Sequence, residues 1–351
     1  MTTILLQQSL LLAVSGALVA VATITARRGR LSFGTAVMWS GIGLLGMLAA
    51  LLIPAVGRIG LFLGLLPAAV LAAGASIVLA TIAFTLSLRV SSLESALQLV
   101  AEEFAIAAAD GPSPPTSEEA TVAIVPAFNE ARSVGTVVDD LLLIGLPVIV
   151  IDDGSTDGTA DVARAHGATV VALPTNLGVG GALRAGMRLA LRRGFTQVVQ
   201  CDADGQHPPE AVRALLDAQR SDPHDLLVGS RFTAHGAGRG EGVVRRIAMA
   251  LLAAFASRAT GVRITDATSG LRAIRRPLLD QVAEHLPRHY LGDTFEVLLS
   301  AGRAGYRVAE HPVRMEERRF GASTASFGAA LGLTTRAVLV AILRAQPTFE
   351  R

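Results

Sequence analysis

The sequence predicts an α/β protein with a mostly parallel sheet, preceded by an all-α transmembrane domain. Three observations lead to this prediction. Residues 1–90 are almost entirely apolar, and no Asp or Glu occurs before Glu94. A segment rich in proline and serine, 111–119, then marks a domain boundary. Beyond it, short runs of β-branched residues alternate with helical patterns, which favours parallel strands covered by helices.

The composition excludes several classes of protein. Hydrophobic residues make up 51% of the 351 residues and the mean hydropathy is +0.50, which is too apolar for an ordinary soluble protein. The net charge is only +2 and the basic residues are scattered, so a nucleic-acid partner is not expected. A single cysteine, Cys201, excludes an internal disulfide framework and a CxxC metal site.

Three apolar segments in the first domain predict three membrane-spanning helices, at about 4–25, 31–56 and 59–88. Each reaches the roughly 20 residues that a span requires. A cleaved signal peptide is the alternative for the first segment. It is disfavoured because no basic region precedes the segment and two further apolar segments follow.

The arginines in the first domain predict its orientation. Arginines 27, 28 and 30 follow the first segment and Arg89 follows the third, whereas Arg58 alone marks the opposite side. The positive-inside rule therefore places 26–30 and everything after residue 89 in the cytoplasm. The chain is expected to be a multi-pass protein of the cell membrane with a cytoplasmic catalytic part.

Segment 91–119 connects the two domains. Its apolar residues, Leu93, Leu97, Val100 and Phe104, recur at steps of three and four. This spacing predicts an amphipathic helix over 91–109 that lies on the membrane or pairs with a neighbour, as in a homo-oligomer. The remaining residues to 119 form a linker.

Polar residues follow each strand predicted in the second domain. The elements are expected in the order strand 121–125, helix 131–144, strand 148–151, helix 158–166, strand 168–172, helix 182–193 and strand 196–200. Asp202 and Asp204 come directly after the last of these strands, at the sheet edge where open α/β folds bind ligands. Two carboxylates there suit Mg²⁺ or Mn²⁺. An isolated Asp-x-Asp is more often a surface turn, so its neighbours decide between these readings.

Four motifs occur together in a fixed order. They are V-P-A-F-N-E at 125–130, V-I-D-D-G-S-T-D-G-T at 150–159, N-L-G-V-G-G-A at 176–182 and D-A-D-G-Q-H-P at 202–208. Together they resemble the family 2 glycosyltransferases of the GT-A fold, and most of all the dolichyl- or polyprenyl-phosphate hexose synthases. The resemblance covers about 120–325.

The resemblance implies roles for the residues in these motifs. Those that would bind the nucleotide sugar are Pro126, Asn129, Glu130, Asp152, Asp153, Asn176, Gly178 and Asp202. Asp204 and Gln206, with Asp202, would hold the Mg²⁺ or Mn²⁺ ion. Asp153 as a residue of an Asx turn, and Asn176 and Gly178 as helix-capping residues, are the alternatives.

Further residues are implied downstream. Arg231 would bind phosphate after a strand at 225–229, and segment 232–242 would open for substrate. Helix 243–260 is read as lying on the bilayer, with Arg245 against lipid phosphate. A helix buried against the sheet is the alternative.

Two more elements resemble family motifs. In Asp266-Ala-Thr-Ser-Gly-Leu-Arg272, the arginine would face the lipid phosphate and the aspartate is the residue suspected as a base. A phosphate monoester has a second pKa near ~6 and needs no base, so Asp266 is expected to orient an arginine or the acceptor. Asp293, which opens a helix, is a second candidate base or a helix cap.

A diphosphate loop resembles the family's R-x-x-G-x-S-K. It comprises Arg318, Arg319 and Ser323, with Thr324 in place of the lysine and Arg319 in compensation. The last part of the chain, 326–351, is expected to contain an amphipathic helix over 326–344.

The resemblance implies an inverting hexosyltransferase. It would move a hexose from a donor of the GDP-mannose or UDP-glucose type to polyprenyl phosphate at the cytoplasmic membrane face. A processive synthase is disfavoured because Q-x-x-R-W is missing and the one tryptophan is Trp39. A glycan or protein acceptor, and a non-catalytic membrane scaffold with a nucleotide-sugar fold, remain as alternatives.

Overall fold

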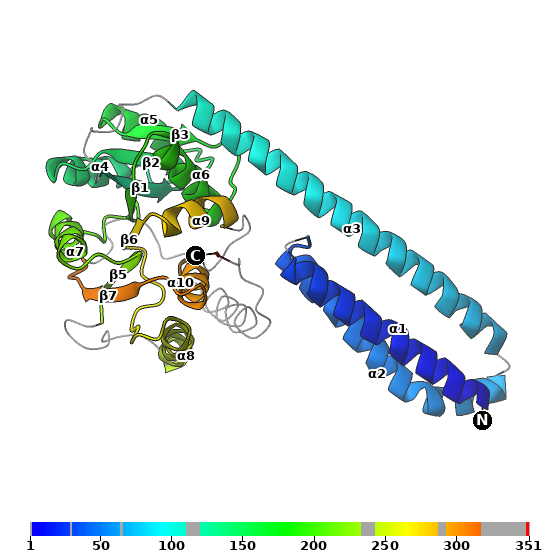
Figure 1. Cartoon of the computed structure of the whole chain (residues 1–351). Coiled ribbons are helices and arrows are strands. Elements are labelled where there is room, and N and C mark those ends of the chain that lie inside the picture. The colour runs from blue at the N-terminus through cyan, green and yellow to red at the C-terminus, as the bar shows by residue number, and fades with distance from the viewer. Residues whose placement is uncertain are drawn as a thin grey trace. The chain divides into compact units, whose positions relative to one another are not determined.

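The computed structural model describes residues 2–28, 30–63, 66–109, 120–232, 243–286, 293–316 and 349–350. The chain forms two compact units, and the division between them falls between Leu97 and Gln98 (Figure 1).

The N-terminal unit is helical. It contains α1 (Thr2–Arg27), α2 (Phe33–Leu63) and most of α3 (Leu66–Ala108). The first two predicted apolar segments fall on α1 and α2, whereas the third, 59–88, begins within α2 and continues in α3. Helices α1 and α2 approach closely where a Cβ on Gly46 would lie 2.3 Å from the Ser15 hydroxyl. Within the described residues, one stretch, Gln8–Arg27, is long and apolar enough to cross a membrane. Insertion of all three helices stays a prediction.

Helix α3 differs from the sequence prediction. Residues 91–109 were expected to form a separate helix, but they continue α3 without a break to Ala108. The reason is local: from Ser76 to Ala108 the chain contains no glycine or proline and is rich in Ala and Leu, so nothing interrupts the helix.

The second unit is built on a seven-stranded sheet in the order β3-β2-β1-β4-β6-β5-β7 (Figure 1). The strands are β1 (Thr121–Ala127), β2 (Val148–Asp152), β3 (Thr169–Ala172), β4 (Gln197–Gln200), β5 (Leu226–Ser230), β6 (Arg272–Arg275) and β7 (Val308–Pro312). Strand β6 runs antiparallel to both of its neighbours, and the other pairs are parallel. The predicted mostly parallel sheet is therefore confirmed.

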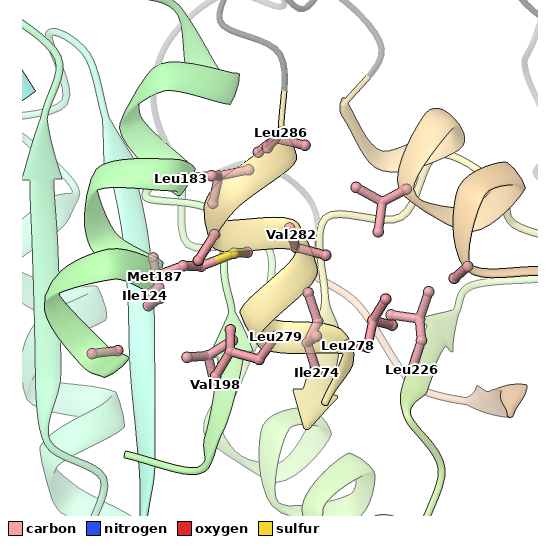
Figure 2. Packing of buried hydrophobic residues seen from close by; sticks show 14 of the residues in the cluster. Ile124, Leu183, Met187, Val198, Leu226, Ile274, Leu278, Leu279, Val282 and Leu286 are labelled. Carbon is pink, nitrogen blue, oxygen red and sulfur yellow. The ribbon is translucent and has the colours of Figure 1, made fainter. Parts of the chain in front are cut away.

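Helices cover both faces of this sheet. They are α4 (Val134–Leu143), α5 (Thr159–Ala165), α6 (Val179–Arg192), α7 (Pro209–Ser221), α8 (Val243–Thr260), α9 (Leu278–His285) and α10 (Asp293–Arg303). Side chains alternate along β1, so Ile124 faces one apolar cluster and Val125 the other. In the first cluster, Leu183 and Met187 of α6 meet Val282 of α9 (Figure 2). Each such buried side chain contributes about 1.5–3 kcal/mol to folding.

Helix α8 has two different faces. Leu252 and Ala256 are buried, and α8 packs against α10, whereas Leu251 and Arg258 are exposed. The helix therefore packs against α10 on one side, where Leu252 and Ala256 belong to an apolar cluster that also contains residues of the sheet. Its other side has an exposed leucine and an exposed arginine. The side chain of Arg245 lies outside the described residues.

Candidate functional site

The candidate site lies at one edge of the sheet, where three adjacent parallel strands end. β1 is hydrogen-bonded to β2 on one side and to β4 on the other. The chain leaves these strands at Ala127, Asp152 and Gln200. The loops that follow, which contain three of the four sequence motifs, therefore begin side by side.

The first two loops are bound to each other through Asn129. The Ser155 hydroxyl accepts a hydrogen bond from the Asn129 backbone N–H at 2.8 Å, and the Asn129 side-chain oxygen accepts one from Thr156 N–H at 3.0 Å. Asn129 has a φ of 55°, a conformation that asparagine tolerates better than most residues. The Glu130 carboxylate accepts from Ser133 Oγ at 2.8 Å. Asn129 and Glu130, which were predicted to bind the nucleotide, thus use these polar atoms to fix the shape of the two loops.

Asp152 and Asp153 are both buried and hold different loops. An Asp152 oxygen accepts from Ser155 N–H at 3.1 Å, within its own turn. An Asp153 oxygen accepts from Leu177 N–H at 2.6 Å, 24 residues further along the chain. Asp153 is therefore not an Asx-turn residue: it fastens the glycine-rich third loop to the second. Burial raises the pKa of the Asp153 carboxyl to about 6, despite backbone hydrogen bonds from Leu177 and Gly178 that lower it.

The third loop leads into α6. The Asn176 side-chain oxygen accepts from Gly178 N–H at 3.0 Å, and Gly178 has a φ of 81° as the residue before the helix. Gly178 is therefore the N-cap residue of α6, whereas the Asn176 side chain closes the turn before the helix and does not cap it. A Cβ on Gly154, which has a φ of 73°, would lie 2.7 Å from the Thr175 carbonyl carbon, so the second and third loops pack backbone to backbone.

The Asp-x-Asp motif follows β4 directly. The Asp204 carboxylate accepts from Gln206 N–H at 3.1 Å, which fixes the turn. The Asp202 side chain is 42% exposed and lies over Gly270, where an added Cβ would come within 2.2 Å of its Oδ2 atom. This contact explains why glycine follows serine in the Ser269-Gly270 element: any side chain would displace the Asp202 carboxylate.

His207 orients Asp202, a role that sequence reasoning missed although His207 lies inside the motif. Its Nδ1 atom accepts from Asp202 N–H at 3.1 Å, so the neutral ring is protonated at Nε2, which lies 3.9 Å from Asp202 Oδ2. The separation of 3.9 Å is longer than a hydrogen bond, so the ring holds Asp202 through its backbone N–H.

The donor atoms at this turn fit a hard divalent cation. Two carboxylates and the Gln206 amide come from one turn at the end of β4. Among the described residues, no group of three or more His, Cys, Asp or Glu side chains could hold a metal by itself. A cation bound here would need further oxygen ligands from a substrate, which is how Mg²⁺ is commonly held between carboxylates and phosphates.

The loop that brings Gly270 to Asp202 also contains Asp266, whose buried carboxylate forms an ion pair. Arg231 follows β5, and its Nε and Nη2 atoms donate to the two oxygens of Asp266 at 2.7 and 3.0 Å. The Asp266 side chain is fully buried, whereas that of Arg231 is 33% exposed. The Asp266 carboxylate therefore holds Arg231 in the bidentate geometry that is strongest for such a pair.

Glu310 supports Asp266 from behind. Its carboxylate accepts from the backbone N–H groups of Thr265 and Asp266 at 2.8 and 2.7 Å. Glu310 lies in β7, more than 40 residues further along the chain. No signal in the sequence links the two, because β7 has no motif and its pairing with β5 is non-local.

The placement of Arg272 differs from its predicted role. The side chain is 1% exposed and does not face open space. Its guanidinium donates to the backbone carbonyls of Ser269, Ala267 and Thr294, at 2.8 Å and 3.1 Å for the first two. Arg272 thus ties the Asp266–Gly270 loop to the start of α10, and its assignment to the lipid phosphate is not supported by this placement.

Several predicted site residues lie outside the described residues. They are Arg318, Arg319, Ser323 and Thr324 of the diphosphate loop, the side chains of Arg245 and Asp293, and nearly all of loop 232–242.

The chain is similar to several known proteins. The family model "Glycosyl transferase family 2" matches residues 122–283. Polyprenol monophosphomannose synthase from Mycolicibacterium smegmatis is 34% identical over 233 residues, which cover 62% of this chain and 86% of that protein. Undecaprenyl-phosphate mannosyltransferase from Micrococcus luteus is 32% identical over 213 residues, covering 58% and 87%. Dolichyl-phosphate hexose transferase from Haloferax volcanii is 33% identical over 196 residues, covering 54% and 80%.

Solved structures show the same fold. Glucosyl-3-phosphoglycerate synthase from Mycobacterium tuberculosis, in complex with phosphoglyceric acid, matches with a TM-score of 0.51 and 22% identity over 70% of this chain and 82% of that chain. The same enzyme in complex with Mn²⁺, uridine diphosphate and phosphoglyceric acid matches with a TM-score of 0.50 and 25% identity, over 70% and 81%. The GT-A fold predicted from the sequence is confirmed.

Proposed function

Because the chain belongs to glycosyl transferase family 2, we propose that it transfers a hexose from a nucleotide sugar to polyprenyl phosphate at the cytoplasmic face of the cell membrane. The product would be a polyprenyl-phosphate hexose. The single observation that supports this best is the convergence of the Asp152–Asp153 loop and the Asp202–Gln206 turn at one sheet edge, in a chain similar to polyprenyl-phosphate mannosyltransferases.

The donor would bind across the three loops. Asp153 would accept a hydrogen bond from the base or ribose, beside the loop that ends at Gly178. Asp202, Asp204 and Gln206 would hold Mg²⁺ or Mn²⁺, as the manganese in the complex of the related synthase suggests. When bound, the cation neutralises the charge that develops on the departing nucleoside diphosphate. Pro126, within β1, would line the nucleotide pocket through its backbone.

Arg231 and Asp266 would stabilise the negative charge of the donor diphosphate. Arg231, held by Asp266, offers a fixed positive charge next to the diphosphate, and a preorganised charge is worth more than a mobile one because no reorganisation is needed during reaction. The acceptor phosphate is already a dianion at neutral pH to a large extent and attacks the anomeric carbon in line, so no side chain needs to remove its proton. One-step attack of this kind inverts the anomeric centre.

A bilayer-facing α8 would bring the acceptor to the site. Leu251 and Arg258 lie on the exposed face of α8, and the other face of the helix packs on α10. Such a face suits the boundary between acyl chains and phosphates. The helical N-terminal unit would hold the catalytic unit at this depth.

A donor screen tests the proposal. Purified protein, Mn²⁺ and a short polyprenyl phosphate are incubated with GDP-mannose or UDP-glucose, and release of the nucleoside diphosphate is measured. Release is expected with one donor and only when the polyprenyl phosphate is present. Equal release without it would mean donor hydrolysis, and acceptor-dependent release only with a glycan or peptide would favour the alternative acceptors.

The raised pKa of Asp153 predicts a pH dependence. When the pH falls below the Asp153 pKa of about 6, the carboxyl becomes protonated and can no longer accept a hydrogen bond as a carboxylate from the nucleotide sugar. The kcat/KM for the nucleotide sugar is therefore expected to fall as the pH drops through that value. Above it, the carboxylate is ionised and kcat/KM levels off. Asp153→Asn keeps an oxygen for Leu177 N–H but cannot titrate, so its lower kcat/KM is expected to keep only the inflection of the acceptor phosphate, whose second pKa is also near ~6. A wild-type profile no steeper than that of Asp153→Asn would contradict the role.

The Arg231–Asp266 pair predicts non-additive substitutions. Arg231→Gln removes the charge and is expected to lower kcat by about 100-fold, while Asp266→Asn lowers it less by loosening the guanidinium. Because both act through one group, the double variant is expected to be no slower than Arg231→Gln alone. A multiplicative loss in the double variant would give Asp266 a separate role, such as that of a base.

A further inference from the structure

Helix α3 presents a long apolar stripe that no described residue covers. Its large side chains are all more than half exposed, with Leu97 at 69% and Phe104 at 75%. They are Leu79, Leu86, Val90, Leu93, Leu97, Val100 and Phe104. Beyond Arg89, the predicted end of the membrane span, five of these residues would face water. An exposed stripe of this length requires a partner.

The spacing of the stripe identifies the kind of partner. From Leu86 to Phe104 the steps alternate between four and three, which is a heptad repeat with Val90, Leu97 and Phe104 at a and Leu86, Leu93 and Val100 at d. An apolar repeat of 3.5 residues stays in line along a helix only when helices supercoil around each other. We call the line of a and d residues from Leu86 to Phe104 the seam. A β-branched residue at a with leucine at d, as in Val90 and Leu93, favours a coiled coil of two helices.

The opposite face of the same helix is already used. Glu102, Ala105 and Ile106 are buried against the catalytic unit, and Glu102 forms a buried ion pair with Arg184 of α6. In the heptad these residues occupy outer positions f, b and c, which point away from the seam. Attachment of α3 to its own catalytic unit therefore leaves the a and d residues exposed.

Charges beside the seam specify a parallel, in-register pairing. Arg89 occupies a g position and Glu94 the e position five residues later. In a parallel pair, a g residue faces the e residue of the next heptad on the partner, so Arg89 of each copy meets Glu94 of the other. The other acidic residue on this side, Glu103, is neutralised within its own chain by Arg188 and Arg192. Two copies with the same membrane orientation can pair only in parallel.

A lipid surface suits this face less well. Helices that lie on membranes have basic polar faces that meet anionic headgroups. From Val90 to Ala109 there is no arginine or lysine, and the charged residues are Glu94, Glu102 and Glu103. We propose that the seam of α3 from Leu86 to Phe104 pairs with the same helix of a second copy as a parallel two-stranded coiled coil.

Cysteine cross-linking in membranes tests this pairing. The natural Cys201 is buried, and Cys201→Ser removes it as a background. Leu93→Cys and Leu97→Cys place thiols on the seam, while Ser95→Cys, at an f position, is the matched control on the same turn of helix. Brief oxidation is expected to give about tenfold or more disulfide-linked dimer for the seam variants than for the control, because pairing raises the effective concentration of the thiols. Equal yields on both faces, or no dimer from either seam position, would overturn the proposal.

A charge exchange tests the register. In the Leu97→Cys background, Arg89→Glu places like charges opposite each other and is expected to lower the dimer yield by about fivefold. Adding Glu94→Arg to the same chain restores opposite charges and is expected to recover the yield. Failure of the double substitution to recover it would contradict the parallel register. The readout is cross-linking, so it does not depend on transferase activity.

Discussion

Asp204→Ala is expected to abolish metal-dependent sugar transfer, with kcat lowered by at least about 100-fold. The carboxylate sits on the turn that follows β4, beside Asp202, where the proposed cation meets the donor diphosphate. Because an Asp204 oxygen also accepts from Gln206 N–H, alanine removes a turn contact as well as a charge. Asp204→Asn is therefore the sharper variant, since its amide oxygen can still accept that hydrogen bond.

The measurement is kcat at saturating donor over a series of Mn²⁺ concentrations, with the thermal unfolding midpoint of each variant. Glu210→Ala is the matched control, because Glu210 is an exposed acidic residue in the first turn of α7. It is expected to leave kcat unchanged. An Asp204→Asn protein that turns over at the wild-type rate would exclude the proposed cation site.

Glu102→Ala is expected to destabilise the catalytic unit by about 3–5 kcal/mol, because it leaves the Arg184 guanidinium buried without its counter-charge. The side chains of Glu102 and Arg184 are 0% and 5% exposed. Arg184 also donates to the Leu286 carbonyl at 2.8 Å, so the pair joins the end of α3 to α6 and α9. The measurement is urea unfolding of the full chain in detergent, combined with hydrogen exchange of the α6 amides.

Neighbouring Glu103 provides the control for this prediction. It is 42% exposed and pairs with Arg188 and Arg192, so Glu103→Ala is expected to cost only about 0–1 kcal/mol. Hydrogen bonds from Arg192 lower the pKa of the Glu103 carboxyl, and the exposed pair remains screened by water. The double variant Glu102→Leu with Arg184→Met is expected to recover most of the lost stability, because neither charge of the pair remains and Arg188 keeps Glu103 as its partner. Equal losses for Glu102→Ala and Glu103→Ala would contradict this account.

The positions of β1, β2 and β4 along the chain could be predicted from the sequence because each is a short apolar run followed by a turn. The ends of β1, β2 and β4 fell within two residues of their expected positions. Strand β6 could not be predicted in this way. Its four residues, Arg272–Arg275, have an arginine at each end, and their pairing with β4 and β5 depends on residues far away in the chain.

The candidate site shows the same division between local and non-local information. Motifs pointed to Asp153 and Asp204, because a chemical type at a strand end is visible in sequence, and the resemblance of its element to a family motif pointed to Asp266. They did not reveal that Asp153 fastens Leu177, or that Arg272 points into backbone carbonyls. Which atoms a polar side chain satisfies is decided by burial, and burial depends on the tertiary fold.

Transfer of labelled sugar to a lipid tests the central claim most directly. Purified protein is incubated with radiolabelled nucleotide sugar, Mn²⁺ and polyprenyl phosphate, and the label is partitioned between organic solvent and water. The proposed activity predicts label in the organic phase that requires both the metal and the polyprenyl phosphate. Label found only in an aqueous glycan or on protein would contradict it.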